Sequence, residues 1–269
     1  MNGFDADQLD RYARQIVLEA VGPDGQARLA DARVLIVGAG GLGSPLIAYL
    51  AAAGVGELVI VDDDRVERSN LQRQIVHGDG DRGRPKVASA AAFVEDLNPE
   101  VSVETHETTF DLDLAREIVP TVDVAVDATD DFGAAFVCND AAMLAGVPAV
   151  FGSVLRFEGQ VTVVDGQPCY RCLFGRAPPP GEVPDCASAG VLGAVPGTIG
   201  TMQATAALHA LIDTAALDGR HVIYDATTLT TETVDIAPNP ECPICGPEAP
   251  IDLAAIEYDD RYGIASVER

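Results

Sequence analysis

A run of polar and basic residues, Ser69-Asn70-Leu71-Gln72-Arg73-Gln74, is the most specific chemical feature of the sequence. Arg73 offers a guanidinium that binds phosphate oxygens in pairs and keeps its charge. Lys86 follows at the start of a predicted helix and is the single lysine among 17 basic residues. An arginine, a lysine and a helix N-terminus together suit the negative charge that develops on a triphosphate. The alternative, a solvated basic loop, is disfavoured because the rest of the chain is acidic.

Carboxylates follow two of the predicted strands. Asp62 ends the second strand, where an acid of a nucleotide-binding fold takes the ribose hydroxyls; the alternative is an ordinary acidic strand end. Asp130 follows a later strand, at the edge of a parallel sheet where ligands bind. Mg²⁺ that arrives with a triphosphate prefers one or two carboxylates plus phosphate and water. The sequence therefore predicts Asp130 as a magnesium ligand, with Asp127 and Asp131 as weaker candidates.

Four of the six cysteines form two C-x-x-C pairs, Cys169 with Cys172 and Cys242 with Cys245. Their spacing is typical of the two halves of a tetrahedral zinc site, and we predict a structural zinc that joins the last strands to the domain. A redox dithiol is the alternative. Such a dithiol usually stands at a helix start, where neither pair is predicted to lie.

The two remaining cysteines differ in their surroundings. Cys186 lies in a polar, turn-like stretch just beyond a proline-rich loop over 176–184. We predict that Cys186 is a nucleophile; a buried apolar cysteine is the alternative. Cys138 lies within an apolar helical stretch and is predicted to belong to the core.

A glycine-rich turn is the element that would organise these side chains. An apolar, β-branched run over 34–37 leads into Gly38-Ala39-Gly40-Gly41-Leu42-Gly43, and a helix is predicted over 45–53. This order of strand, turn and helix presents backbone N–H groups to phosphate. Gly38 and Gly40 allow the turn and the close approach of a phosphate, and Gly43 lets the helix pack on the strand. Alone, the turn predicts a nucleotide and leaves NAD, FAD and ATP open.

The wider pattern alternates strands and helices and predicts an α/β fold, a Rossmann-like and mostly parallel sheet with helices on both faces. Strands are predicted over 34–37, 58–61, 101–104, 122–126 and 148–151, and helices over 45–53, 85–97, 112–118 and 132–145. Residues 1–30 are predicted to be helical, with a break at 22–25. After residue 150 the pattern predicts an extended stretch over 159–164, a helix over 197–213 and an antiparallel pair over 221–224 and 231–236. We expect one domain over 1–247 and a loosely held acidic tail over 248–269.

The composition excludes some classes of function. A net charge of −25 argues against nucleic acid as a partner. No apolar run reaches the roughly 18 residues of a membrane span, and the polar N-terminus shows no signal peptide, so we expect a cytoplasmic protein without membrane partners. The acids are spread along the chain, as in proteins that stay soluble in the salt-loaded cytoplasm of halophilic archaea.

Taken in order, the motifs resemble the ThiF/MoeB/HesA family of ubiquitin-activating-enzyme-like adenylyltransferases, over residues 9–247. The matching motifs are Arg11-Tyr12-x-Arg14-Gln15, the turn over 38–43, the run over 69–74, Gly83-x-Pro85-Lys86, Thr129-Asp130, Glu158-Gly159-Gln160, both cysteine pairs and Cys186-x-x-Ala189-Gly190-Val191. The acidity and the scarcity of lysine make the chain most similar to archaeal members.

The resemblance implies that MgATP adenylates the C-terminal glycine of a small ubiquitin-like or sulfur-carrier protein ending in Gly-Gly, with release of pyrophosphate. Sulfur or a thiol then attacks the acyl-adenylate, for protein tagging, molybdopterin synthesis or tRNA thiolation. The resemblance divides the domain into N-terminal helices over 1–30, a nucleotide-binding half over 31–155 and a partner-binding half with the zinc site over 156–247.

The family's site residues carry over by motif. The implied ATP-binding residues are Gly38, Gly40, Gly41, Gly43, Asp62, Ser69, Asn70, Arg73, Lys86, Asp130 and Asp131. Arg14 would reach the ATP of the other subunit in a homodimer. Cys186 matches the thioester-forming position, and the paired cysteines match the zinc site.

Two departures from the family stand out. The usual Thr-Asp-Asn is Thr129-Asp130-Asp131 here, and Ala135 replaces a frequent arginine. We expect them to shift ATP affinity or ionic requirements without abolishing activity. No sulfurtransferase domain of the rhodanese type follows, so a separate sulfurtransferase is expected.

Two other functions compete with adenylation. An NAD(P)-dependent oxidoreductase would need a catalytic Tyr-x-x-x-Lys or His-Asp pair beyond the sheet, which one lysine and four histidines make hard to build. A non-catalytic scaffold is disfavoured by the intact set of Arg73, Lys86 and Asp130.

Overall fold

The structure is a computed structural model, in which residues 4–175, 189–214, 219–249, 252–253 and 256 are described. Its described strands form one sheet in the order β3-β2-β1-β4-β5-β6-β7-β8. The strands are β1 (Arg33–Val37), β2 (Glu57–Val61), β3 (Ser102–His106), β4 (Val124–Asp127), β5 (Ala149–Leu155), β6 (Glu158–Val164), β7 (Arg220–Asp225) and β8 (Thr230–Asp235). The first five strands run parallel and the last three are antiparallel. The order 3-2-1-4 of the parallel part is that of the Rossmann fold, which confirms the predicted fold class.

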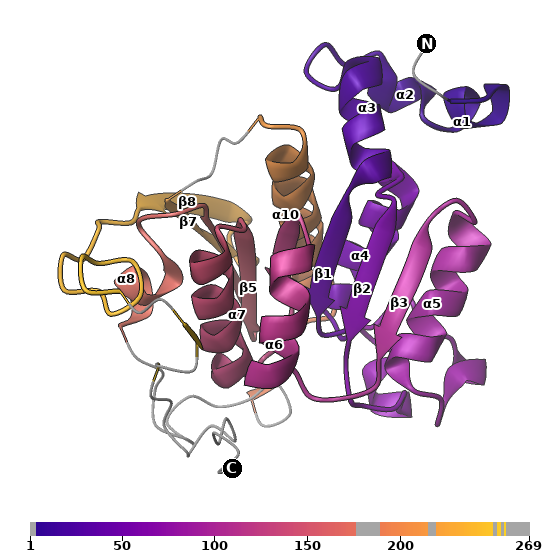
Figure 1. Ribbon diagram of the computed structural model, residues 1–269. Coiled ribbons are helices and arrows are strands. Elements are labelled where there is room, and N and C mark those ends of the chain that lie inside the picture. The colour runs from indigo at the N-terminus through magenta and orange to yellow at the C-terminus, as the bar shows by residue number, and fades with distance from the viewer. Residues whose placement is uncertain (1–3, 176–188, 215–218, 250–251, 254–255, 257–269) are drawn as a thin grey trace.

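Helices cover both faces of the sheet (Figure 1). The α-helices are α1 (Ala6–Arg11), α2 (Ala13–Ile16), α3 (Gly22–Asp31), α4 (Gly43–Ala53), α5 (Lys86–Leu97), α6 (Leu112–Ile118), α7 (Phe132–Ala145), α8 (Tyr170–Phe174) and α10 (Ala194–Leu211). Short 3₁₀ helices are η1 (Arg68–Asn70), η2 (Asp79–Asp81) and η3 (Val119–Thr121).

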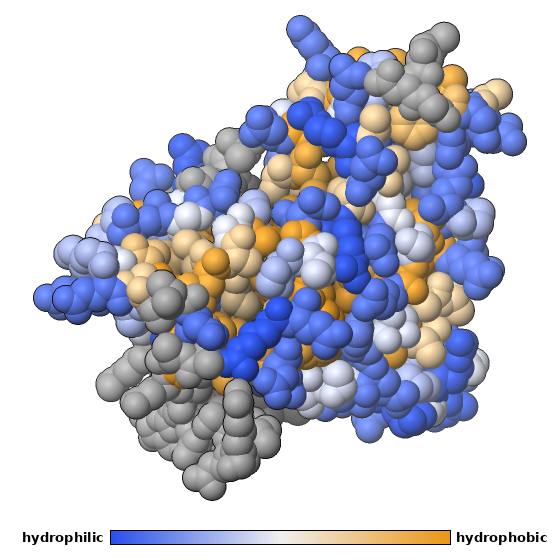
Figure 2. All heavy atoms as spheres, in the orientation of Figure 1, coloured by the Kyte–Doolittle hydropathy of each residue, from blue (hydrophilic) through white to orange (hydrophobic). Residues whose placement is uncertain are grey.

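Side-chain alternation along β1 divides the core into two layers. Val34 and Ile36 pack with α4, α5 and α10 on one face, whereas Leu35 and Val37 pack with α6 and α7 on the other. Successive side chains of a strand point to opposite faces, and a parallel sheet covered on both faces needs apolar residues at every position. This explains why the run over 34–37 has no polar residue. Figure 2 shows hydrophilic residues over most of the visible surface around this core.

The N-terminal segment differs from the prediction. The expected break at 22–25 is instead the first turn of α3, because Pro23 stands in that turn, where its missing N–H costs no helical bond. The first helix is two short ones that meet at Tyr12. The Tyr12 ring packs against Gly54, at the end of α4. The N-terminal helices therefore lie at the edge where the parallel strands begin (Figure 1).

Two other segments differ from what the sequence predicts. β5 continues past residue 151 to Leu155 and pairs with β6 as a hairpin. Gly152 interrupts the apolar pattern there because the side chain of Gln203 occupies the space beside it.

The acidic tail is not wholly loose, since Leu253 is only 4% exposed and packs in the same core layer as α6. Among the described residues, no helix combines the length and apolarity needed to span a membrane.

Candidate functional site

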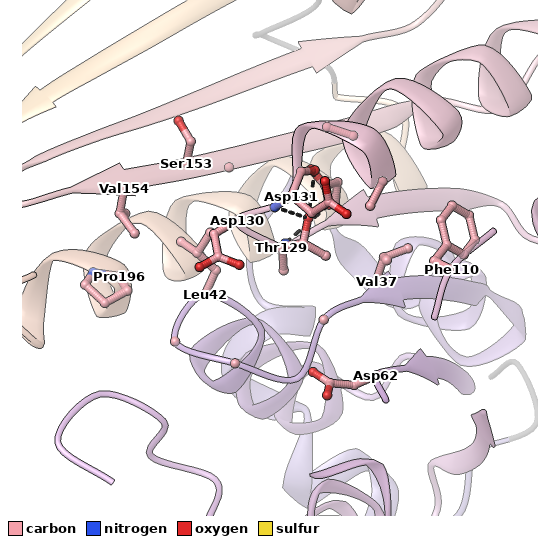
Figure 3. A pocket seen from close by; sticks show the side chains of 18 of the residues that line it. Val37, Leu42, Asp62, Phe110, Thr129, Asp130, Asp131, Ser153, Val154 and Pro196 are labelled. Carbon is pink, nitrogen blue, oxygen red and sulfur yellow. Dashed lines mark hydrogen bonds between the residues drawn. The ribbon is translucent and has the colours of Figure 1, made fainter. Parts of the chain in front are cut away.

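A cavity of about 520 Å³ opens at the carboxyl ends of the parallel strands. Its walls come from the segments that follow β1, β2 and β4 and from the end of β5. In a sheet of this order, β1 and β4 flank the point where the strand order reverses, and ligands bind in the crevice there. Figure 3 shows the side chains of these segments around the cavity.

The glycine-rich turn forms one wall. Gly38 has a φ of +96°, and a side chain there would crowd the carbonyl of Ala128. Gly43 starts α4, and a Cβ atom on it would overlap the carbonyl oxygen of Gly38. Gly38, Gly40 and Gly41 line the cavity, whereas Gly43 lies behind the turn. The structure thus shows why the turn needs glycine at Gly38 and Gly43, while the expected approach of a phosphate to the turn stays a prediction.

Lys86 and Asp62 meet at the same wall. The Lys86 side chain is 6% exposed, and its Nζ lies 2.7 Å from Oδ2 of Asp64 and 3.9 Å from Oδ1 of Asp62. Oδ2 of Asp62 accepts a hydrogen bond of 2.7 Å from the N–H of Ala39. Burial raises the pKa of Asp62, and the charge of Lys86 opposes that effect. Lys86 is therefore a buried cation, oriented by two carboxylates at the cavity wall.

Part of the segment over 69–74 contributes to the cavity wall. Arg73 packs its side chain against Gly41 and donates from Nη1 to the carbonyl of Ser69 over 3.2 Å. Asn70 and Arg73 line the cavity. Ser69 is not among the lining residues, and its hydroxyl donates to Glu67.

The three aspartates at and just after the end of β4 have different environments. Asp127 is buried and accepts hydrogen bonds from the N–H and hydroxyl of Thr129; burial raises its pKa to about 7. Asp131 is the N-cap of α7 and accepts from the N–H of Gly133 over 2.7 Å. Figure 3 shows the exposed Asp130 directed toward the glycine-rich turn. Asp130 is thus the carboxylate of this loop best placed to meet a cation.

Asp131 and Ala135, the two residues that depart from the family pattern, lie at the start of α7. Aspartate and asparagine are about equally good N-caps, so Asp131 preserves the start of α7. Ala135 is buried at the cavity wall, where it leaves space but no charge.

Acids outnumber bases around the cavity. The lining acids are Asp62, Asp63, Asp64, Asp127, Asp130, Asp131 and Glu158, against Arg73 and Lys86. A polyanionic ligand would be repelled by these carboxylates unless cations accompanied it. This charge balance fits a triphosphate that arrives with Mg²⁺.

The four paired cysteines converge at α8, which begins directly after Cys169. Their sulfur atoms all lie within 4.8 Å of one another, with 3.6 Å between Cys169 and Cys242 and 3.4 Å between Cys172 and Cys245. Four sulfurs at about 2.3 Å from zinc would be separated by roughly 3.8 Å, so the cluster could hold a tetrahedral metal ion.

One expectation about these cysteines is wrong. Cys169 is the N-cap of α8, so its pair does stand at a helix start. The sequence gives no helical period there because α8 has only five residues. The convergence of all four thiols, which a single redox pair does not need, nevertheless favours the metal site.

A buried ion pair that the sequence analysis missed joins the cysteine cluster to α7. The Nε and Nη2 atoms of Arg171 donate to the two carboxylate oxygens of Asp140 over 2.7 and 2.6 Å, and Asp140 is fully buried. Asn139 accepts from the N–H of Tyr170 over 2.8 Å. The only signal in the sequence is Asn139-Asp140 in an apolar helix and an arginine between two cysteines.

Cys138 is fully buried in α7, which confirms its predicted place in the core. Arg14 is exposed in α2, at the opposite edge of the sheet from the cavity, so the structure does not bring it to this site. Cys186 and the proline-rich loop lie outside the described residues.

The chain matches known proteins over most of its length. The model of the ThiF family matches residues 12–244. The chain is 55% identical to the SAMP-activating enzyme E1 of Haloferax volcanii, covering 97% of this chain and 98% of that one. It is 44% identical to the sulfur carrier protein adenylyltransferase of Thermus thermophilus, covering 96% and 98%. Among solved structures, Escherichia coli MccB aligns with a TM-score of 0.77 at 22% identity, over 88% of this chain and 75% of that one, and shows the fold.

Some relatives are longer. The adenylyltransferase and sulfurtransferase MOCS3 of Anopheles gambiae is 40% identical, and the match covers 98% of this chain but 60% of that one. On the family model and the two relatives matched nearly end to end, this chain belongs to the ThiF family.

Proposed function

We propose that this protein adenylates the C-terminal carboxylate of a small ubiquitin-like modifier or sulfur carrier that ends in Gly-Gly. The observation that carries the proposal is the meeting of the glycine-rich turn, Arg73, Lys86 and Asp130 around one cavity. The names of the relatives, a SAMP-activating enzyme and a sulfur carrier protein adenylyltransferase, support it.

The cavity residues would have separate roles in an attack at the α-phosphate of ATP. The carboxylate of the partner protein attacks the α-phosphorus of ATP, an acyl–phosphate bond forms, and pyrophosphate leaves. The glycine-rich turn offers backbone N–H groups to the phosphates, and Arg73 and Lys86 offset the charge that moves to the leaving group. Asp130 would hold Mg²⁺, which when bound neutralises charge on the phosphate chain.

The oxidoreductase alternative finds no support in this cavity. All four histidines lie in the described part of the chain, and none of them lines the cavity. The lysine that a Tyr-x-x-x-Lys pair would need is Lys86, which is already paired with Asp64.

The test is ATP–pyrophosphate exchange at molar salt, with a purified ubiquitin-fold protein ending in Gly-Gly. We expect labelled pyrophosphate to enter ATP only when the partner is present. The matched control is the same partner without its two terminal glycines. No exchange with any such partner, together with binding of NADH, would reject adenylation and favour the oxidoreductase.

We propose that the cysteine cluster binds one structural Zn²⁺ per chain. Its removal by a chelator is expected to lower the melting temperature, because the cluster holds α8 and the segment over 242–245 together. The measurement is metal analysis followed by thermal unfolding of the Cys245→Ser variant. Cys138→Ser is the control that should leave the zinc content unchanged. Folded protein without zinc, at an unchanged melting temperature, would reject this site.

We propose that Cys186 takes the acyl group from the adenylate as a thioester, with AMP leaving and the thiol proton passing to solvent. The Cys186→Ala variant should keep ATP–pyrophosphate exchange within about twofold of wild type while losing transfer to the downstream acceptor. Gel detection of a thiol-sensitive conjugate measures the intermediate. Full transfer activity in the variant would return Cys186 to a structural role. Where the acceptor is sulfur, we propose that a separate sulfurtransferase supplies it.

We propose a homodimer in which Arg14 reaches the nucleotide of the other subunit. The exposed position of Arg14, far from the cavity of its own chain, supports this arrangement. Sedimentation that shows only monomer at working concentrations would contradict it.

We also propose that the protein works in a salt-rich cytoplasm, which the net charge of −25 and the Haloferax relative support. Activity that does not increase with salt would count against this proposal.

A further inference from the structure

A buried histidine that the proposed chemistry does not use lies directly behind the glycine-rich turn. His77 is 5% exposed, and its ring joins two elements. Nε2 lies 2.9 Å from the carbonyl oxygen of Ala39, and Nδ1 lies 2.9 Å from Oγ of Ser89 on α5. The ring therefore spans from α5 to the second residue of the turn.

The two contacts assign the proton on the ring. A backbone carbonyl only accepts hydrogen bonds, so Nε2 must carry a proton and donate it to Ala39. In the neutral ring Nδ1 is then an acceptor, to which the hydroxyl of Ser89 can donate; that hydroxyl also faces the carboxylate of Asp81. Burial and the charge of Lys86 lower the pKa of His77, which agrees with a neutral ring, although the bond to Ala39 and the charges of Asp62 and Asp81 oppose the shift.

The contact with Ala39 determines where the next N–H points. The carbonyl of Ala39 and the N–H of Gly40 belong to one planar trans peptide, so they point in opposite directions. His77 holds the carbonyl on the protein side, and the N–H of Gly40 must therefore face away from His77. The N–H of Ala39 is fixed as well, because Asp62 accepts it over 2.7 Å.

The next two N–H groups are left for a ligand. Within the described part of the chain, neither Gly40 nor Gly41 donates its N–H to another backbone group, and both residues line the cavity. By contrast, the N–H of Gly38 donates to Val61 and that of Ser44 donates to Gly40. The N–H of Gly40 is the first of these unpaired donors, and it directly follows Ala39, which His77 and Asp62 fix from behind.

We propose that His77 is a positioning residue that aims the N–H of Gly40 at the phosphate chain of ATP. The inference rests on the proposed function only in taking ATP as the nucleotide. His77 touches no reacting atom. Its effect on the reaction passes through the peptide between Ala39 and Gly40.

The test compares two substitutions at His77 with a matched control. His77→Gln keeps an N–H donor near the position of Nε2, whereas His77→Leu removes it. His209→Leu removes another histidine hydrogen bond, that to Thr214 beyond the end of α10. Calorimetry gives the Kd of MgATP without the partner protein, and exchange kinetics give separate KM values for ATP and for the partner.

We expect His77→Leu to raise the Kd and the KM of MgATP about tenfold, the loss of roughly one directed hydrogen bond. The KM of the partner protein should stay the same. His77→Gln should recover most of the loss, and His209→Leu should match wild type. If His77→Leu does not fold, Ser89→Ala replaces it, with an expected rise of about threefold because the ring loses the bond that fixes its tautomer.

An unchanged Kd in His77→Leu, or in Ser89→Ala where that variant stands in, would overturn the proposal. So would an equal loss in His77→Gln and His77→Leu, since that would show a packing role only. Failure of the proposed function would look different, because wild type would bind MgATP but exchange no pyrophosphate with any Gly-Gly partner. The Kd values of the His77 variants for MgATP would then still test the role of His77.

Discussion

Lys86→Met is expected to lower the rate of ATP–pyrophosphate exchange by about 10²–10³-fold, the range seen when one preorganised electrostatic donor is removed from an active site. Lys86 and Arg73 are the basic residues of a cavity that seven acids line. Without Lys86, Asp62 and Asp64 lose their cation, and the negative charge that moves onto pyrophosphate has one partner fewer. Binding of ATP should weaken as well, but by less than the rate, since the charge develops during the reaction.

Two variants separate this effect from a general loss of charge. Lys86→Arg keeps the charge but must fit a larger, planar group where the lysine side chain is 6% exposed, so we expect partial activity. Arg65→Met removes an exposed cation that pairs with Glu107 and does not line the cavity, and it should exchange at the wild-type rate. Lys86→Met that retained more than a tenth of the wild-type rate would contradict the proposed role.

The nucleotide-binding part could be predicted because its signals are local. The apolar run over 34–37 and the glycines after it belong to one strand and its turn, and the aspartates at the ends of β2 and β4 each belong to a strand end or the turn that follows it. A parallel sheet then brings these ends to a single edge without further information. The residues that line the cavity at the strand ends lie together for that reason, although they are almost 100 positions apart in the sequence.

The remaining features depend on contacts between segments far apart in the sequence. Nothing near His77 predicts that its ring reaches Ala39, 38 residues earlier. The spacing of the cysteines predicted the cluster but not the helix that Cys169 caps. The break expected at 22–25 failed because proline and glycine there start α3. Proline and glycine break a helix in its interior, but in the first turn proline is tolerated, so their position within the segment matters more than their presence.

The buried pair of Asp140 and Arg171 should have the largest effect on stability. Arg171→Met is expected to lower the free energy of unfolding by about 3–5 kcal/mol, the usual cost of leaving one buried charge without its partner. Asp140 is fully buried on α7, where the side-chain amide of Asn139 also donates to its carboxylate over 2.9 Å. Urea unfolding at constant molar salt measures the change. Arg116→Met breaks exposed pairs with Asp113 and Asp252 and is the control, with an expected change of about 0–1 kcal/mol.

The double variant Asp140→Leu with Arg171→Met shows what the pair is for. Replacing a buried pair by apolar groups is often neutral, so the double variant should regain much of the stability that Arg171→Met loses. Because Arg171 lies between Cys169 and Cys172, the pair also fixes α8 and the cysteine cluster against α7, whose first turn borders the cavity. If the double variant regains stability but adenylates more slowly, the pair orients α8 and the cysteine cluster relative to the cavity. Equal free energies of unfolding for wild type, Arg171→Met and the double variant would show instead that the two charges are not buried together in solution.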